Sequence, residues 1–317
     1  MRAARAIRSC ALVIGIVAGF FASTGGPAAA TFPGRNGLIA FDTVGNFDIG
    51  RARSDIFTVE PDGSHLRRLT DTPRGFESSS PDWSPDGRRI LFIENSSYNA
   101  EIWVMNADGS NKRQITFAPD FDDLDPTWAP DGSHLAFSRC SFQGRCKLMT
   151  MRLDGTGRHK VLGGNWQYFG AQYSPDGTQI VFDSTRGGLQ SAVWIVGIDG
   201  TGLQRLTRPR LEAFYPDWSP DGQHILFTDF CCRAKSNIWV MRTDGSRQRR
   251  ITSFAGGHQG AFATYSPSGR KIVLWSDLAH DDGCCNDVYV MRVDGSGLHR
   301  VTTAQPGVLR TDWGPRR

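Results

Sequence analysis

The sequence predicts an all-β fold, a six-bladed β-propeller whose blades are four-stranded antiparallel sheets. Asp-Gly pairs recur about every 45 residues, and a second series of turns, mostly Pro-Asp-Gly, recurs between them at the same interval. The runs between the turns are short and rich in β-branched and aromatic residues. Two series at one period indicate a repeat architecture.

Both series are expected to be hairpin turns, because Asp-Gly is favoured where a tight turn between strands needs positive φ. The first series is Asp62-Gly63, Asp108-Gly109, Asp154-Gly155, Asp199-Gly200, Asp244-Gly245 and Asp294-Gly295. The second is Ser84-Pro85-Asp86-Gly87, Ala129-Pro130-Asp131-Gly132, Ser174-Pro175-Asp176-Gly177, Ser219-Pro220-Asp221-Gly222 and Ser266-Pro267-Ser268-Gly269.

One repeat shows the four expected strands, a to d, in order: 81–84, 90–92, 102–105 and 113–116. Strands b and c are apolar at consecutive positions, where a sheet with one wet face would alternate. Both faces must therefore be covered, and the stacking of blades around an axis does this.

The two ends of the chain predict how the ring closes. The first repeat begins with a strand b at 38–41, with no strand a before it, and the chain finishes with an unpartnered strand a at 311–314. We expect the C-terminal strand to complete the first blade, which leaves no open edge.

Residues 1–30 are expected to be a secretory signal peptide. Arg2, Arg5 and Arg8 precede an apolar run from Ala11 to Ala22, and small residues end at Ala30, after which we expect cleavage. The run is too short to span a bilayer. We therefore expect residues 31–317 to be one soluble propeller domain, secreted or held in the periplasm or cell envelope, without stable membrane insertion.

The charge balance favours neither nucleic acid nor a membrane surface as partner. The chain has 36 Lys and Arg against 32 Asp and Glu, and three of these arginines lie in the predicted signal peptide. The remaining net charge is about +1, which is too small to attract polyanions.

The Trp-Ser-Pro-Asp-Gly pattern at 83–87 and 218–222 resembles the PD40, or WD40-like, repeats of TolB and of prolyl-oligopeptidase-type peptidases. The resemblance implies a propeller and no particular activity, because the repeated residues build turns and blade contacts. TolB has an α/β domain before its propeller, whereas these blades begin within a few residues of the expected cleavage site. No G-x-S-x-G motif of a serine hydrolase is present.

Six cysteines follow the predicted signal peptide, and an even number in an exported protein indicates disulfides. Cys140 and Cys146 lie at the two ends of one loop, so we expect them to pair. Cys231, Cys232, Cys284 and Cys285 form two adjacent pairs. They either cross-link neighbouring blades or close within each pair.

Comparing equivalent positions across blades separates architecture from function. Five of the seven histidines lie at repeated or turn positions, namely His65, His134, His159, His224 and His299. His258 and His280 remain, both in non-repeating loops of blade six. The loop from 276 to 287 also holds Asp277, Asp281 and Asp282, and His258 is followed by Gln259.

Two candidate sites follow. The first is a ring of polar residues six positions before the aromatic of each strand a, at Glu77, Asp122, Gln167, Glu212 and Gln259. It would bind a polar ligand or cation, or simply line a solvent-filled funnel. The second is the blade-six loop, where imidazole and carboxylate groups would bind calcium or act as an acid/base pair, unless the loop is merely solvated.

We therefore expect an exported, monomeric, non-enzymatic binding module that presents variable loops to a protein, peptide or glycan and requires no cofactor. The alternatives are a metal-assisted lyase or hydrolase acting on extracellular carbohydrate, and a structural component of the cell envelope. The enzyme would need His258 and His280 to converge.

Overall fold

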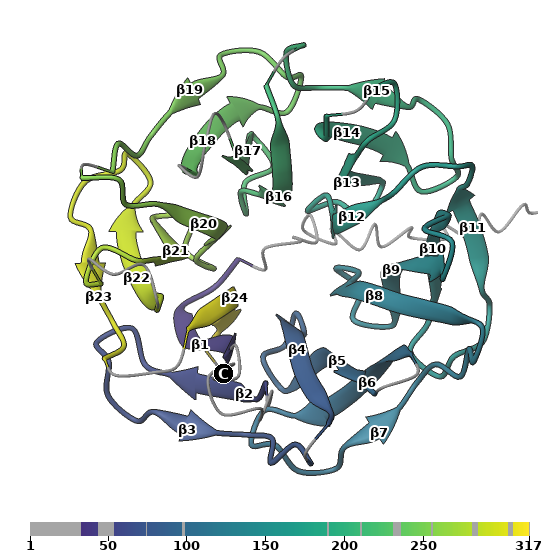
Figure 1. Cartoon of the computed structure of the whole chain (residues 1–317), viewed down its shortest axis with the longest axis horizontal. Helices are drawn as coiled ribbons and strands as arrows, with labels where there is room; N and C mark the ends of the chain where they lie inside the picture. Colours follow the sequence, from purple (N-terminus) through teal and green to yellow (C-terminus); the bar gives the residue numbers. More distant parts are fainter. Residues whose placement is uncertain are drawn as a thin grey trace, which may run out of the picture.

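A computed structural model of the chain describes residues 33–43, 54–73, 75–96, 99–188, 190–209, 211–230, 236–254, 256–280, 285–303 and 307–316. Within these ranges, 24 strands form six four-stranded sheets, arranged as blades around a central axis (Figure 1). All neighbouring strands in a sheet are antiparallel, as β5 and β6 illustrate. The predicted six-bladed propeller is confirmed.

Each blade runs from an inner strand at the axis to a short outer strand. Blade 1 contains β24 (Val308–Pro315), β1 (Asn36–Thr43), β2 (Ile56–Val59) and β3 (Arg67–Arg68). Blade 2 contains β4 (Glu77–Trp83), β5 (Arg89–Asn95), β6 (Ala100–Asn106) and β7 (Arg113–Gln114). Blade 3 contains β8 (Phe121–Trp128), β9 (His134–Ser141), β10 (Cys146–Arg152) and β11 (His159–Leu162).

The other three blades follow the same plan. Blade 4 contains β12 (Phe169–Tyr173), β13 (Gln179–Ser184), β14 (Ala192–Gly197) and β15 (Gln204–Arg205). Blade 5 contains β16 (Ala213–Trp218), β17 (His224–Asp229), β18 (Asn237–Arg242) and β19 (Arg249–Arg250). Blade 6 contains β20 (Gly260–Tyr265), β21 (Lys271–Ser276), β22 (Asp287–Arg292) and β23 (His299–Arg300).

The closing strand is where the two ends of the chain meet. β24 pairs with β1, with Trp313 opposite Ile39 and Thr311 opposite Phe41. The Trp313 indole N–H also donates to the Gly37 carbonyl, at 3.0 Å. The closure predicted from the sequence is confirmed, and the strand is longer than the predicted 311–314.

The core lies between the blades. In β17, Leu226 packs into the cluster shared with blade 6, while its neighbour Phe227 packs into the cluster shared with blade 4. Both side chains are fully buried. Consecutive apolar residues therefore face two different neighbouring sheets. This is why apolar and polar residues do not alternate along a strand such as β17.

The turns and loops lie at opposite ends of the strands. We call the end with the a–b and c–d hairpins the turn face, and the end with the d–a and b–c connections the loop face. On the turn face the glycines have positive φ, such as 85° at Gly63 and 63° at Gly87, as the Asp-Gly signal predicts.

The predicted signal peptide, residues 1–30, lies outside the described residues and stays a prediction. Among the residues that are described, no helix has the length and apolar character needed to cross a bilayer.

Candidate functional site in the central channel

A bulge in the inner strand of every blade shapes the wall of the central channel. The pairing with the next strand shifts register there, for example between Ser79 and Asp82 in blade 2. In five blades the bulged residue has φ between 49° and 56°, which is uncommon for residues other than glycine. These residues are Ser80, Asp125, Gly170, Tyr215 and Phe262, and Arg310 takes the same position in β24.

Side chains of the preceding blade hold this strained backbone in place. The Ser80 N–H donates to the Asp42 carboxylate at 2.9 Å, and the Tyr215 N–H donates to Asp183 at 3.0 Å. Hydrogen bonds to carboxylates are among the stronger ones in proteins. They stabilise a conformation that would otherwise cost about 1–3 kcal/mol.

Arg310 reaches across the channel from the closing strand. Its guanidinium forms an ion pair with Asp125 of blade 3 at 2.9 Å and a long, 3.5 Å hydrogen bond to the Tyr215 hydroxyl of blade 5. It also lies over the rings of Tyr215 and Phe262, 4.6 and 5.2 Å from their centroids. The backbone N–H of Arg310 donates to the Asp42 carboxylate at 2.6 Å. One side chain thus joins four blades.

Arg310 borders two cavities on the axis. Toward the loop face, a cavity of about 230 Å³ has largely apolar walls, which include Ile93, Leu124, Phe169 and Leu309. Deeper in the channel, a smaller cavity of about 70 Å³ has more polar walls. The larger cavity is therefore a pocket with largely apolar walls, and it is also lined by Arg310, Asp125 and Asp42.

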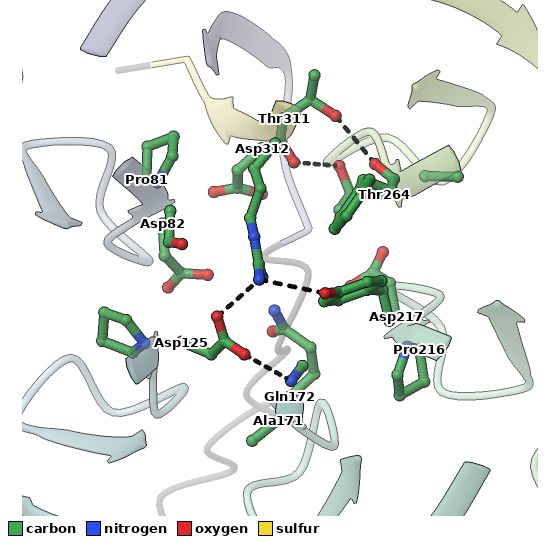
Figure 2. Close-up of a pocket in the computed structure, with 17 residues that line it drawn as sticks. Pro81, Asp82, Asp125, Ala171, Gln172, Pro216, Asp217, Thr264, Thr311 and Asp312 are labelled. Atoms are coloured by element: carbon green, nitrogen blue, oxygen red, sulfur yellow. Dashed lines mark hydrogen bonds and ion pairs between the residues drawn. The ribbon is translucent and has the colours of Figure 1, made fainter. Parts of the chain in front are cut away.

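Three carboxylates of the deeper cavity join neighbouring blades. Asp82, Asp217 and Asp312 come from three different inner strands and lie around a shared space (Figure 2). Each accepts a backbone N–H from the inner strand of the next blade: Asp82 from Trp128 at 2.8 Å, Asp217 from Tyr265 at 2.7 Å and Asp312 from Trp83 at 2.6 Å. These three carboxylates therefore connect neighbouring blades by hydrogen bonds.

Burial controls the protonation of several carboxyl groups in and around the channel. It raises the pKa of Asp183 to about 7 and that of Asp312 to about 6. Burial, together with the nearby Asp312, raises the pKa of Asp82 well above its usual range. Burial also raises the pKa of Asp42. In each case the low-dielectric surroundings disfavour the charged form.

The predicted polar ring lies nearer the loop face than these cavities. Glu77 begins β4, and Asp122 lies near the start of β8, where its carboxylate accepts the Ala100 N–H at 3.0 Å. Gln167, Glu212 and Gln259 lie just before their inner strands. The two axial cavities are lined by residues further along the strands. Ligand binding by the five-residue ring therefore stays a prediction.

The two candidate histidines of blade 6 each have their own carboxylate partner. His258 lies 3.5 Å from Asp277, and His280 lies 2.7 Å from Asp287. The Asp277 carboxylate also accepts the Gln259 N–H at 2.8 Å. Asp281 and Asp282 lie outside the described residues. Within the part of the chain that the structure describes, no group of three or more His, Cys, Asp or Glu residues could hold a metal ion.

The disulfide between Cys140 and Cys146 is confirmed. Cys231, Cys232 and Cys284 lie outside the described residues, and Cys285 lies just before β22. The pairing of these four cysteines stays a prediction.

The sequence did not predict a role for Arg310, Asp125, Tyr215 or Asp42. A signal for the first three was present, because the position three residues before the strand-a aromatic holds a different residue type in every blade. Comparison of repeat positions would have marked it as variable. The meeting of these side chains across the axis was not visible in the sequence.

Comparisons with known proteins agree with the repeat analysis. The family model of the PD40 TolB β-propeller domain matches residues 122–229. The Tol-Pal system protein TolB 1 of Novosphingobium aromaticivorans is 37% identical over 70 residues, which are 22% of this chain and 15% of that protein. The chain thus matches well under two thirds of that relative. Residues 122–229 consist of TolB-type PD40 repeats, and the resemblance inferred from the sequence is confirmed.

Solved structures show the same fold at low identity. TolB from Acinetobacter baumannii superposes with a TM-score of 0.72 at 20% identity, covering 88% of this chain and 67% of that one. An oligogalacturonate lyase in complex with manganese superposes with a TM-score of 0.56 at 16% identity, covering 87% of this chain and 77% of the lyase. At these identities the comparisons show the propeller architecture alone.

Proposed function

We propose that this TolB-like propeller is an exported, non-enzymatic binding module that holds a segment of a protein or peptide at the loop-face end of its channel. The observation that carries the proposal is the cavity of about 230 Å³ above Arg310. Apolar walls with a few convergent polar groups are typical of ligand-binding pockets. Ile93, Leu124, Phe169 and Leu309 would contact an apolar side chain of the partner.

The distribution of exposed apolar side chains supports the same face. Among the described residues, seven large hydrophobic side chains are exposed, and five of them lie on the loop face. Those five are Phe76, Phe117, Phe142, Phe230 and Leu309. Leu66 and Ile198 lie singly on the turn face. Exposed apolar groups that gather on one face are typical of interaction surfaces.

The charges at the cavity floor indicate which polar group the partner would offer. A guanidinium has five N–H groups, and among the described residues Asp125 and Tyr215 accept bonds from it. Asp42 and Asp183 add further carboxylates near the same arginine. Because the guanidinium is already paired with Asp125, we expect the partner to offer a neutral acceptor such as a main-chain carbonyl.

The enzyme alternative rests on His258 and His280, and each of them bonds to a separate carboxylate. The fold shared with the lyase carries no activity to this chain. We therefore propose binding without catalysis.

A peptide selection tests the proposal. Random 12-residue peptides displayed on phage are selected on the wild-type protein, and the enriched peptides are measured against L309E and F169E by fluorescence anisotropy. We expect either change to weaken binding at least about tenfold, because a charge in the apolar wall must be desolvated when a partner packs on it. L66E, on the turn face, is the matched control.

Binding that L309E and F169E leave unchanged would contradict the proposed location. If the selection yields no specific peptide while oligosaccharides bind in an L309E-sensitive way, the partner class is wrong and the glycan alternative replaces it.

A further inference from the structure

Strand c and strand d of a blade are joined by a repeated polar contact. In blade 1 the Asp55 carboxylate, just before β2, forms an ion pair with Arg68 at 2.7 Å. In blade 6 the Asp287 carboxylate, at the start of β22, forms an ion pair with Arg300 at 2.6 Å. An acid before strand c and a base on strand d thus neutralise each other at the edge of the propeller.

In blade 3 a lysine replaces the acid. In blades 1 and 6 the base lies opposite the residue two positions after the acid, with Arg68 opposite Phe57 and Arg300 opposite Tyr289. In blade 3 Lys160 lies opposite Met149 in the same register. The residue two positions before Met149 is Lys147, so a lysine stands where Asp55 and Asp287 stand. Two cations replace an ion pair.

The two lysines are close together and exposed. A Cβ placed on Gly163 would lie 3.3 Å from the Lys160 Cδ and 3.9 Å from the Lys147 Cγ, so both stems border the same glycine. Both side chains are exposed. Lys147 lies 6.0 Å from the centroid of the Phe121 ring. Two like charges on neighbouring strands favour an added anion.

A rigid loop next to them carries an exposed phenyl ring and a further cation. The disulfide between Cys140 and Cys146 closes the hairpin that contains Phe142 and Arg145. Phe142 is 60% exposed, and Arg145 is also exposed. A loop held in one conformation loses little entropy when it binds.

Carboxylates are scarce on this part of blade 3. From 139 to 168 the chain contains one acid, Asp154, and it lies in the c–d turn on the opposite face. On the inner strand, Asp123 is paired with Arg139 at 2.6 Å, and the Asp122 carboxylate accepts the Ala100 N–H of blade 2 at 3.0 Å. In blade 3, the outer part of the loop face therefore carries more cations than carboxylates.

We propose that Phe142, Arg145, Lys147 and Lys160, which together we call the blade-3 rim, bind an acidic segment of a protein partner. The four residues combine an aromatic anchor with cations, and Phe and Arg are enriched in protein interfaces. The partner's carboxylates would take the place that Asp55 and Asp287 occupy in blades 1 and 6. None of the four residues lines the channel cavities, so this inference stands apart from the proposed function.

The repeat itself supplies the test variant. K147D restores the acid found in blades 1 and 6, so the introduced carboxylate would pair with Lys160 as Asp55 pairs with Arg68, and the fold should be kept. R158D makes the same charge change in the c–d turn of the same blade and is the matched control. Thermal melting of each variant verifies folding.

The probe is a fluorescein-labelled peptide of alternating Glu and Phe, measured by anisotropy at about 50 and 500 mM NaCl, where screening differs strongly. We expect K147D to weaken binding at least about tenfold and R158D less than about twofold. We expect F142S to weaken binding severalfold with little change in salt dependence, because it removes an apolar contact.

Two outcomes would overturn the proposal. Equal loss of binding in K147D and R158D would show a diffuse charge effect without a defined surface. Polygalacturonate that binds more tightly than the peptide, with the same sensitivity to K147D, would replace the protein partner by an anionic polysaccharide.

Discussion

The aspartates of the turn face and those of the channel are the same residue type in opposite electrostatic situations. On the turn face, Asp62 accepts hydrogen bonds from the hydroxyl and N–H of Ser64 in open solvent, and these bonds lower its pKa. In the channel, burial raises the pKa of Asp183 to about 7 although it too accepts a backbone N–H. Burial outweighs hydrogen bonding at Asp183, whereas burial is nearly absent at Asp62.

The difference in burial separates two structural roles of aspartate in this protein. The turn aspartates shape each repeat from within, and every blade has them. The channel aspartates join different blades and vary from blade to blade, as Asp42, Asp125 and Asp183 show. We therefore expect turn substitutions to have small effects and channel substitutions to have large ones.

The largest effect is expected for R310A. Removing the guanidinium leaves Asp125 without its ion pair and leaves Asp42 and Asp183 near it without a compensating cation. Breaking one side of a buried ion pair typically costs about 3–5 kcal/mol. We expect a loss of about 3 kcal/mol in the free energy of unfolding, measured in urea, and D125N in the same chain should recover part of it.

D312A should have the next largest effect. The Trp83 N–H, at the junction of blades 1 and 2, would lose its acceptor in a buried place. An unsatisfied buried donor costs about 1–3 kcal/mol. Urea unfolding should show a loss of about 2 kcal/mol, and a variant as stable as the wild type would show that the channel aspartates do not hold the blades together.

D183N tests the direction of the pH dependence. The folded pKa, about 7, lies above the unfolded value of about 3.9, so the folded state binds this proton more tightly. The free energy of unfolding that this group controls therefore falls as pH rises from about 4 to 7 and stays low above that. D183N should unfold with a flatter pH dependence and should be more stable than the wild type at pH 8.

D154N, in the c–d turn of blade 3, should have a small effect with the opposite sign. Hydrogen bonds from Thr156 lower the pKa of Asp154, so its stabilisation is present above the unfolded pKa and is lost as pH falls through the folded pKa. We expect a decrease in Tm of about 2 °C or less at pH 7 by calorimetry. A loss comparable to that of D312A would remove the distinction between the two sets.

Calcium should have the smallest effect. His280 and Asp277 in the blade-six loop are already bonded within the protein, to Asp287 and to the Gln259 N–H. We expect no change in Tm at about 5 mM CaCl2, since a ligand stabilises only when it binds the folded state. An increase of several degrees would favour the metal site at this loop.

Much of the architecture was predictable because it depends on local chemistry. Asp-Gly forms tight turns whatever surrounds it, and consecutive apolar residues such as Leu226 and Phe227 require two covered faces. The unpartnered strands at the two ends of the chain predicted the closure between β1 and β24. The disulfide between Cys140 and Cys146 followed from its short loop.

The channel site was not predictable in the same way. Arg310 and Asp125 are 185 residues apart in the sequence, and their contact arises only when the ring closes. The ring proposed at Glu77 and its equivalents lies a few residues before the cavity walls. The bulge that directs the wall residues into the channel has no sequence motif of its own, so the sequence did not predict those residues.

The sequence by itself determined the repeat, the blade count, the turn positions and the strand that closes the ring, since each depends on short-range preferences repeated six times. The tertiary structure alone decided which side chains meet on the axis, which carboxylates are buried enough to hold a proton near pH 7, and that Lys147 replaces an acid beside Lys160. These properties depend on burial and on contacts between strands, which appear only when the blades are packed together.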